Sequence, residues 1–224
     1  MRRFTLTRRL TYLFSGAVVA GSLALVCGQA DPALAGPCGS AVASGSNCTM
    51  TGTVNLTAGT LTLTSPSSLA WGTTLTGVDQ SLVDTTAADQ QYTVDDATGS
   101  GAGWHVTTSA TTFTNGSATF PNTGTFSTNG STSSATATSG PSATCTATCT
   151  LPSDSTTYPV AITTAVSSPT PVTIYDDAAT FGLGQILIGG STHTNPVGWW
   201  VQVPASAISG AYTSTITMAI ISGP

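Results

Sequence analysis

Apolar and polar residues alternate along several short stretches of this 224-residue chain. Leu61 and Leu63 alternate with threonines, Trp104 and Val106 flank His105, and apolar residues occupy most of the even positions from 212 to 220. A period of two places such side chains on one face of an extended strand. Shorter β-branched or aromatic runs predict further strands at residues 54–56, 91–94, 160–163, 171–175, 186–188 and 199–203.

The composition favours strands over helices. After position 9 the chain is rich in Thr, Ser, Gly, Ala and Val and has no Lys, Arg or Glu, the residues that normally cover helix surfaces. Turn signals such as Asn115-Gly116, Asn129-Gly130 and Gly189-Gly190 separate the apolar runs. About eight to ten short strands at this spacing predict an all-β fold, a single antiparallel β-sandwich over residues 36–224.

The first 35 residues have the pattern of a secretory signal peptide. All four basic residues lie within positions 2–9, an apolar run follows at 13–26, and Ala33-Leu34-Ala35 precedes Gly36. We therefore expect an exported, extracellular protein that begins at Gly36. The twin arginines of Thr7-Arg8-Arg9-Leu10 allow a folded-protein export signal as the alternative, but Thr11 stands where such signals have a large apolar residue. Val26 is too bulky to precede a lipidated cysteine, so Cys27 is expected to be removed with the signal.

The charge of the mature chain excludes several classes of partner. All nine acidic residues are Asp, and only Asp31 precedes Gly36, so residues 36–224 have a formal charge of −8 and no Lys or Arg. Nucleic acid, anionic lipid surfaces and phosphate sites all require cations that this chain lacks. An uncharged sugar or another protein is the more credible partner.

Four cysteines remain after cleavage, in an oxidising compartment: Cys38, Cys48, Cys145 and Cys149. Two disulfides are therefore expected, and three pairings are possible. Proximity in the sequence favours Cys38 with Cys48 and Cys145 with Cys149. Spacings of ten and four with no adjacent His do not resemble a zinc ribbon.

Between residues 123 and 150 the chain is almost entirely Ser, Thr, Ala and Gly. Such a stretch cannot bury a core of its own, so we expect a long surface excursion from the sandwich.

Two passages carry a resemblance to a known family. Residues 92–110 read YTVDDATGSGAGWHVTTSA, and residues 198–217 begin GWWVQVP and end GAYTSTIT. Together they resemble the WxL domain of Gram-positive surface proteins, with its D-x-x-G-x-G-x-G-W approach to the first Trp strand and its V-P and G-x-Y-T-S-T segments after the second. Leu61-Thr62-Leu63 and Leu69-Ala70-Trp71-Gly72 are similar to the opening strands of the family. Where the family has Leu, both motifs here read Trp-x-Val, with Val106 and Val201.

The resemblance implies a domain held non-covalently at the cell wall, through peptidoglycan or another wall glycan. Because WxL proteins are encoded beside other surface proteins, the alternative is a structural subunit of an extracellular assembly with protein partners. The chain ends without a sorting signal or apolar tail, so neither covalent anchoring nor a membrane span after signal cleavage is expected.

The strand pattern assigns roles to the motif residues. Trp104 shares a face with Val106 and Trp199 shares one with Val201, so these four side chains are expected in the core. His105 and Trp200 point to the opposite face and are the candidate binding residues. An exposed Trp200 indole would offer a plane for stacking a sugar ring, and covering by the Ser/Thr excursion is the alternative.

Other polar residues give weaker signals. The glycines of 99–103 predict a tight loop with positive φ rather than a phosphate loop, because no helix or Lys follows. The pairs Asp95-Asp96 and Asp176-Asp177 could bind Ca²⁺, and the alternative is that adjacent Asp residues face opposite sides and water. No other cofactor is indicated. With only His105 and His193, no Glu and no nucleophile elbow, the chain is predicted not to be an enzyme and no catalytic residue is assigned.

Overall fold

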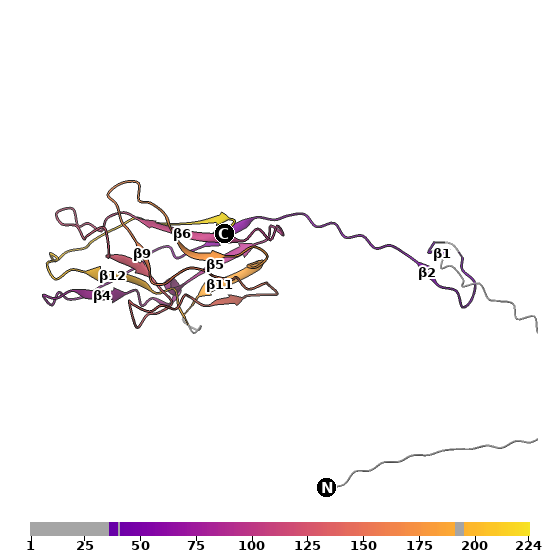
Figure 1. Cartoon of the computed structure of the whole chain (residues 1–224), viewed down its shortest axis with the longest axis horizontal. Coiled ribbons are helices and arrows are strands. Elements are labelled where there is room, and N and C mark those ends of the chain that lie inside the picture. The colour runs from indigo at the N-terminus through magenta and orange to yellow at the C-terminus, as the bar shows by residue number, and fades with distance from the viewer. Residues whose placement is uncertain (1–35, 40, 191–194) are drawn as a thin grey trace, which may run out of the picture. The chain divides into compact units, whose positions relative to one another are not determined.

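A computed structural model describes residues 36–39, 41–190 and 195–224 (Figure 1). The predicted signal peptide, residues 1–35, and His193 lie outside the described residues. The chain divides into two units, residues 1–55 and 56–224. In the first unit, β1 (Gly36–Pro37) pairs in parallel with β2 (Cys48–Thr49), and a disulfide joins Cys38 to Cys48 across a Cα–Cα distance of 5.0 Å.

The second unit consists of three antiparallel sheets, which confirms the predicted all-β sandwich. The sheet orders are β10-β6-β13, β3-β5-β11-β8 and β4-β12-β7-β9. The strands are β3 (Leu61–Thr64), β4 (Gln80–Val83), β5 (Gln91–Asp96), β6 (Trp104–Ala110), β7 (Phe126–Thr128), β8 (Ala143–Cys145), β9 (Val160–Ile162), β10 (Val172–Asp177), β11 (Gly184–Gly189), β12 (Trp199–Val203) and β13 (Ile216–Ser222). The one helix in the part described is the short 3-10 turn η1 (Ala87–Gln90), so no described helix could cross a membrane.

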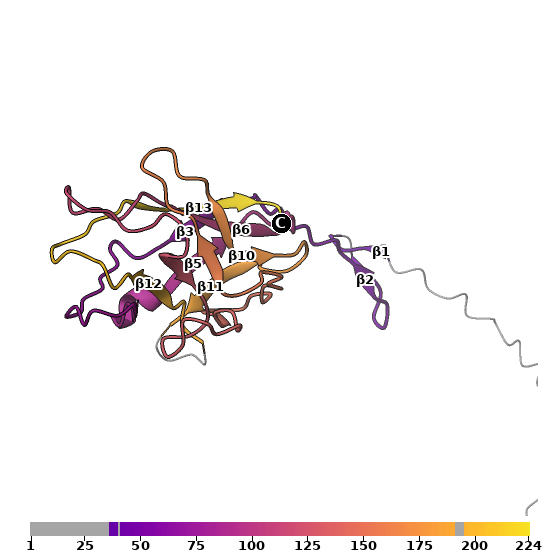
Figure 2. The same cartoon turned by 60° about the vertical axis from the view of Figure 1, so that its left-hand side comes forward.

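A single apolar core joins the three sheets of this unit. In Figures 1 and 2, β6 and β12 lie in different layers. The motif tryptophan of each strand belongs to the shared core. Trp104 and Trp199 are fully buried, together with Val94 on β5, Phe126 on β7 and Ile186 on β11. Alternation along each strand thus directs one apolar row from every sheet into the same space.

Most of the predicted strands are present. The runs at 61–63, 91–94, 104–108, 160–163, 171–175, 186–188 and 199–203 correspond to β3, β5, β6, β9, β10, β11 and β12. Two predictions are wrong. Residues 54–56 form no strand, and the last strand begins at Ile216 rather than Tyr212, because Tyr212 stacks on Phe120 and Thr213 forms only an isolated bridge to Thr114.

The predicted excursion at 123–150 is only partly on the surface. Its residues 126–128 form β7, which lies between β12 and β9, and residues 143–145 form the edge strand β8. Buried polar side chains there have hydrogen-bond partners: the Thr128 hydroxyl donates to the distant Val197 carbonyl oxygen at 2.9 Å, and the Asn129 amide donates to the Ser134 carbonyl oxygen at 3.0 Å. Small polar residues with satisfied hydrogen bonds can therefore occupy an interior strand.

The burial of the motif tryptophans predicts that they act on stability. Trp104→Ala or Trp199→Ala removes a fully buried indole and should lower the free energy of unfolding by about 3 to 5 kcal/mol. Chemical denaturation measures this loss. As the control, Val166→Ala changes a side chain that is 81% exposed and should change stability by less than about 0.5 kcal/mol. Unchanged stability of both tryptophan variants would show that the indoles do not support the core.

Candidate functional site

The two motif tryptophans are held by their indole nitrogens as well as by packing. The Trp104 Nε1 donates to the Gly182 carbonyl oxygen at 3.0 Å, and the ring stacks on Tyr175 with centroids 5.8 Å apart. The Trp199 Nε1 donates to the Asp89 carbonyl oxygen at 3.0 Å. Val106 and Val201 lie in the same core. These four residues are therefore structural, although Trp199 and Val201 each contribute part of the lining of a surface hollow described below.

The loops around Trp104 need glycine. Gly103 has φ +77°, and a Cβ there would collide with the backbone of Asp177 and Ala178. Gly182 has φ +63°, and a Cβ there would collide with the Asp177 carboxylate and the Trp104 indole. The positive φ expected of the loop at 99–103 is found at Gly99, Gly101 and Gly103. The close approach of these loops fixes the environment of Trp104.

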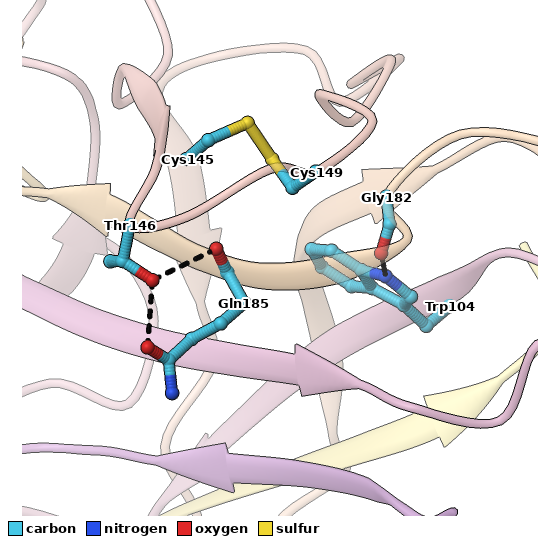
Figure 3. Close-up of a disulfide and its surroundings, with 6 residues drawn as sticks. All are labelled: Trp104, Cys145, Thr146, Cys149, Gly182 and Gln185. Carbon is cyan, nitrogen blue, oxygen red and sulfur yellow. Dashed lines mark hydrogen bonds between the residues drawn. A yellow bond between two sulfur atoms is a disulfide. The ribbon is translucent and has the colours of Figure 1, made fainter.

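The second predicted disulfide lies next to this region. Cys145 and Cys149 are bonded, with Cα atoms 5.5 Å apart. Figure 3 shows the bridge beside β11, where the Thr146 hydroxyl donates to the Gln185 side-chain oxygen at 2.7 Å, and the Trp104–Gly182 hydrogen bond lies nearby. The disulfide closes the short loop after β8, and hydrogen bonds from Thr146 to Gln185 hold that loop against β11. No ligand role follows from it.

Trp200 is not available for stacking, so this prediction is wrong. Its side chain is only 5% exposed, and its Nε1 donates to the Ser131 carbonyl oxygen at 2.9 Å and to the Asn129 side-chain oxygen at 3.2 Å. The physical reason is that residues 129–131 of the Ser/Thr-rich stretch fold over the outer face of β12. A sugar ring needs an open indole face, and here that face is covered.

His105, on β6, lies beside the last residues of the chain rather than in a site built of aromatic rings. Its Nδ1 donates to the Gly223 carbonyl oxygen at 2.6 Å, which ties the segment after β13 back to β6. A hollow of about 340 Å³ beside it is lined by Ser155, Thr156, Asp176 and Pro224, among others. Because no Trp, Tyr or Phe among the described residues lines this hollow, His105 is a weaker binding candidate than the groove described below.

The two Asp pairs do not converge on a cation. Adjacent residues of a strand point to opposite faces, so Asp95 and Asp96 on β5 diverge, as do Asp176 and Asp177 on β10. Asp96 is 5% exposed and accepts hydrogen bonds from the Thr98 backbone and hydroxyl. Among the described residues, no three His, Cys, Asp or Glu side chains gather as a metal site. The calcium prediction at Asp95 and Asp96 therefore finds no support in their geometry.

Asp177 is the most perturbed carboxyl. Its side chain is fully buried; Oδ1 accepts a hydrogen bond from the Ser153 amide at 2.9 Å, and Oδ2 has no partner. Burial raises the pKa of Asp177 to about 6, repulsion from Asp176, Asp96 and Asp154 adds to the rise, and the Ser153 hydrogen bond opposes it. No described cation is nearby to stabilise the charged form, so Asp177 opposes folding when ionised.

Two adjoining hollows lie on the surface of the sandwich unit and share part of their lining. The first, about 420 Å³, lies between residues 65–71 and 212–218, and its polar rim includes Ser65, Ser67 and Ser68. The second, about 660 Å³, lies between residues 71–75 and 207–212. Trp71, Phe113 and Tyr212 line both. We call the two together the aromatic groove.

Fixed aromatic rings give the groove its shape. The half-buried Trp71 donates from Nε1 to the Trp199 carbonyl oxygen at 3.0 Å and meets Phe113 edge to face, with centroids 6.0 Å apart. Tyr212 stacks on Phe120 with centroids 4.1 Å apart, and its hydroxyl donates to the Ile208 carbonyl oxygen. Among the described residues that line the groove, none carries a formal charge. Such a surface can bind an uncharged ligand by stacking and by hydroxyl hydrogen bonds, and it holds no pair of acid and base groups for catalysis.

Sequence reasoning did not identify this groove. The sequence pattern predicts Trp71 to be part of an opening strand and Tyr212 to be part of the terminal strand. In the structure neither lies in a strand, because residues 65–79 and 204–215 run mostly without regular pairing. The signal that could have identified Trp71 and Tyr212 as groove residues is that each is a large aromatic residue within a Ser/Thr-rich segment.

The pKa of Asp177 predicts how stability depends on pH. Its pKa is raised from 3.8 to about 6 on folding, so the native state binds more protons between these values. The stabilisation is complete below about pH 4 and is lost as pH rises through about 6, by at most about 3 kcal/mol. Asp177→Asn should remove this decline in denaturation curves measured from pH 4 to 7, whereas Asp95→Asn, a change on the outer side of β5, should retain it. An equal decline in Asp177→Asn would show that another group causes it.

Searches of the chain against protein-family models, curated proteins and solved structures found no match in any of the three.

Proposed function

We propose that this chain is an exported, non-catalytic binding protein that is held non-covalently at the cell wall and binds peptidoglycan or another uncharged wall glycan. The observation that carries the proposal is the first hollow, where the Trp71 and Tyr212 rings lie beside a rim of serine hydroxyls without formal charge. Sugar rings stack on aromatic faces and exchange hydrogen bonds with hydroxyls. The signal-like first 35 residues and the WxL-like motifs support the same conclusion.

The charge of the mature chain limits how it could bind a wall. With only Asp as charged residues it has no attraction to anionic wall polymers, so binding depends on neutral contacts or on divalent cations that bridge. Moderate salt should therefore leave the protein bound. Secretion and wall association are part of the proposal.

Sedimentation with purified peptidoglycan tests the proposal. The mature protein, residues 36–224, should pellet with the wall material at moderate salt. Tyr212→Ala removes one stacking face and Ser68→Tyr fills the hollow, so each should weaken binding by about tenfold. Val166→Tyr places the same new ring on a side chain that is 81% exposed, lies outside both hollows and should not affect binding.

The outcomes distinguish a wrong function from a wrong binding site. Wild-type protein that stays in the supernatant with and without Ca²⁺ would reject wall binding. Wild-type protein that pellets equally well with Tyr212→Ala and Ser68→Tyr would leave wall binding in place and move the site elsewhere. Thermal melts of each variant exclude simple unfolding as the cause of lost binding.

A second function, as a structural subunit of an extracellular assembly, is favoured by a different observation. The second hollow is more apolar and is rimmed by Leu75 and Ile208, which are 40% and 58% exposed. Exposed apolar side chains around a concave surface are typical of protein-binding sites.

A further inference from the structure

We infer that residues 50–57 of one copy of this protein add as an extended strand to the second hollow of another copy, so that copies join head to tail. The inference rests on the assembly-subunit alternative and not on wall binding. It names the partner as this chain itself.

The donor segment has the pattern of a strand but no sheet. Residues 50–57 read MTGTVNLT, so Met50, Val54 and Leu56 share one face with Gly52, while the other face carries Thr and Asn. In the structure this segment forms no strand, and those three apolar side chains are 81%, 79% and 90% exposed. No backbone hydrogen bond joins residues 50–57 to other described residues. The segment therefore exposes both apolar side chains and backbone groups that a sheet would satisfy.

The acceptor surface lacks a strand where one could lie. The floor of the second hollow includes Leu82 on β4, Val201 and Val203 on β12, and Phe120. Its walls are residues 72–75 and 207–211, which form no strand in the structure. An extended peptide between such walls can exchange backbone hydrogen bonds with them and insert every second side chain into the apolar floor.

Charge and size agree with this pairing. Each mature copy carries −8, yet neither residues 50–57 nor the described residues of the second hollow include a formal charge. Contact at these two surfaces thus brings copies together without opposing carboxylates. Salt screens the remaining repulsion, so added salt should strengthen the association. The occupant must be extended, because a hollow of about 660 Å³ accepts a few side chains and not a folded domain.

The geometry of the contact predicts the form of the assembly. Each copy has one donor segment and one acceptor hollow, which are different surfaces, so the interface is heterologous. Such an interface extends into linear oligomers whose length grows with protein concentration. Blocking either surface on every copy should therefore stop growth completely.

Light scattering on mature protein from about 1 to about 100 μM tests the inference, with no wall material present. Wild type should form oligomers that lengthen with concentration. Val54→Ser with Leu56→Ser removes the donor side chains, and Leu75→Ser with Ile208→Ser weakens the acceptor, so each double variant alone should be monomeric. The control Val42→Ser with Val166→Ser changes two exposed valines outside both surfaces and should assemble as wild type does.

Mixing the two monomeric variants tests directly whether the donor segment binds the acceptor hollow. The donor variant keeps an intact hollow and the acceptor variant keeps an intact segment, so the mixture should form dimers and nothing larger. A wild type that is monomeric at every concentration overturns the inference, as does a donor variant that assembles normally or a mixture that stays monomeric. Ser68→Tyr in the first hollow should leave assembly intact, so failure here and failure of wall binding are distinguishable.

Discussion

The burial of four indole rings in a chain of small polar residues is the constraint on which the rest of this structure depends. Each buried or half-buried indole N–H needs an acceptor, and each finds a main-chain carbonyl far away in sequence: Trp71 at Trp199, Trp104 at Gly182, Trp199 at Asp89 and Trp200 at Ser131. These bonds connect strands to segments outside the sheets, namely the short turn η1 at Asp89 and the loops that contain Trp71, Gly182 and Ser131. The loops are thereby positioned by the tryptophans as much as by the sheets.

The aromatic groove follows from the same constraint. The Trp71 indole donates to the main-chain carbonyl of Trp199, so the backbone of β12 at a core residue holds a second indole at the rim of the sandwich. Phe113 and Phe126 then pack against the edge of Trp71, and its remaining surface faces the hollows. Because Asp is the only charged residue type after position 9 and none lines the groove, this surface is suited to uncharged partners.

The fold class and the core roles of Trp104 and Trp199 could be predicted because alternation reports burial on one face. The burial of Trp200 could not be predicted in this way. Both faces of the interior strand β12 are covered, so alternation along it does not show which side chains are exposed. The interior strand β7 was also not predicted, since the hydrogen bonds that allow Thr128 and Asn129 to be buried are made to distant or irregular segments. The aromatic groove depends on unpaired segments, for which periodicity has no signal.

Hydrogen exchange with and without soluble, uncharged wall-glycan fragments separates the two roles proposed for the aromatic residues, support of the core by the motif tryptophans and ligand binding at the aromatic groove. At protein concentrations too low for self-assembly, we expect added glycan to protect residues 65–75 and 207–218 and to leave the amides of β6 unchanged. Protection confined to the surroundings of His105 or Trp200, with residues 65–75 and 207–218 unaffected, would rule out the groove as the binding site.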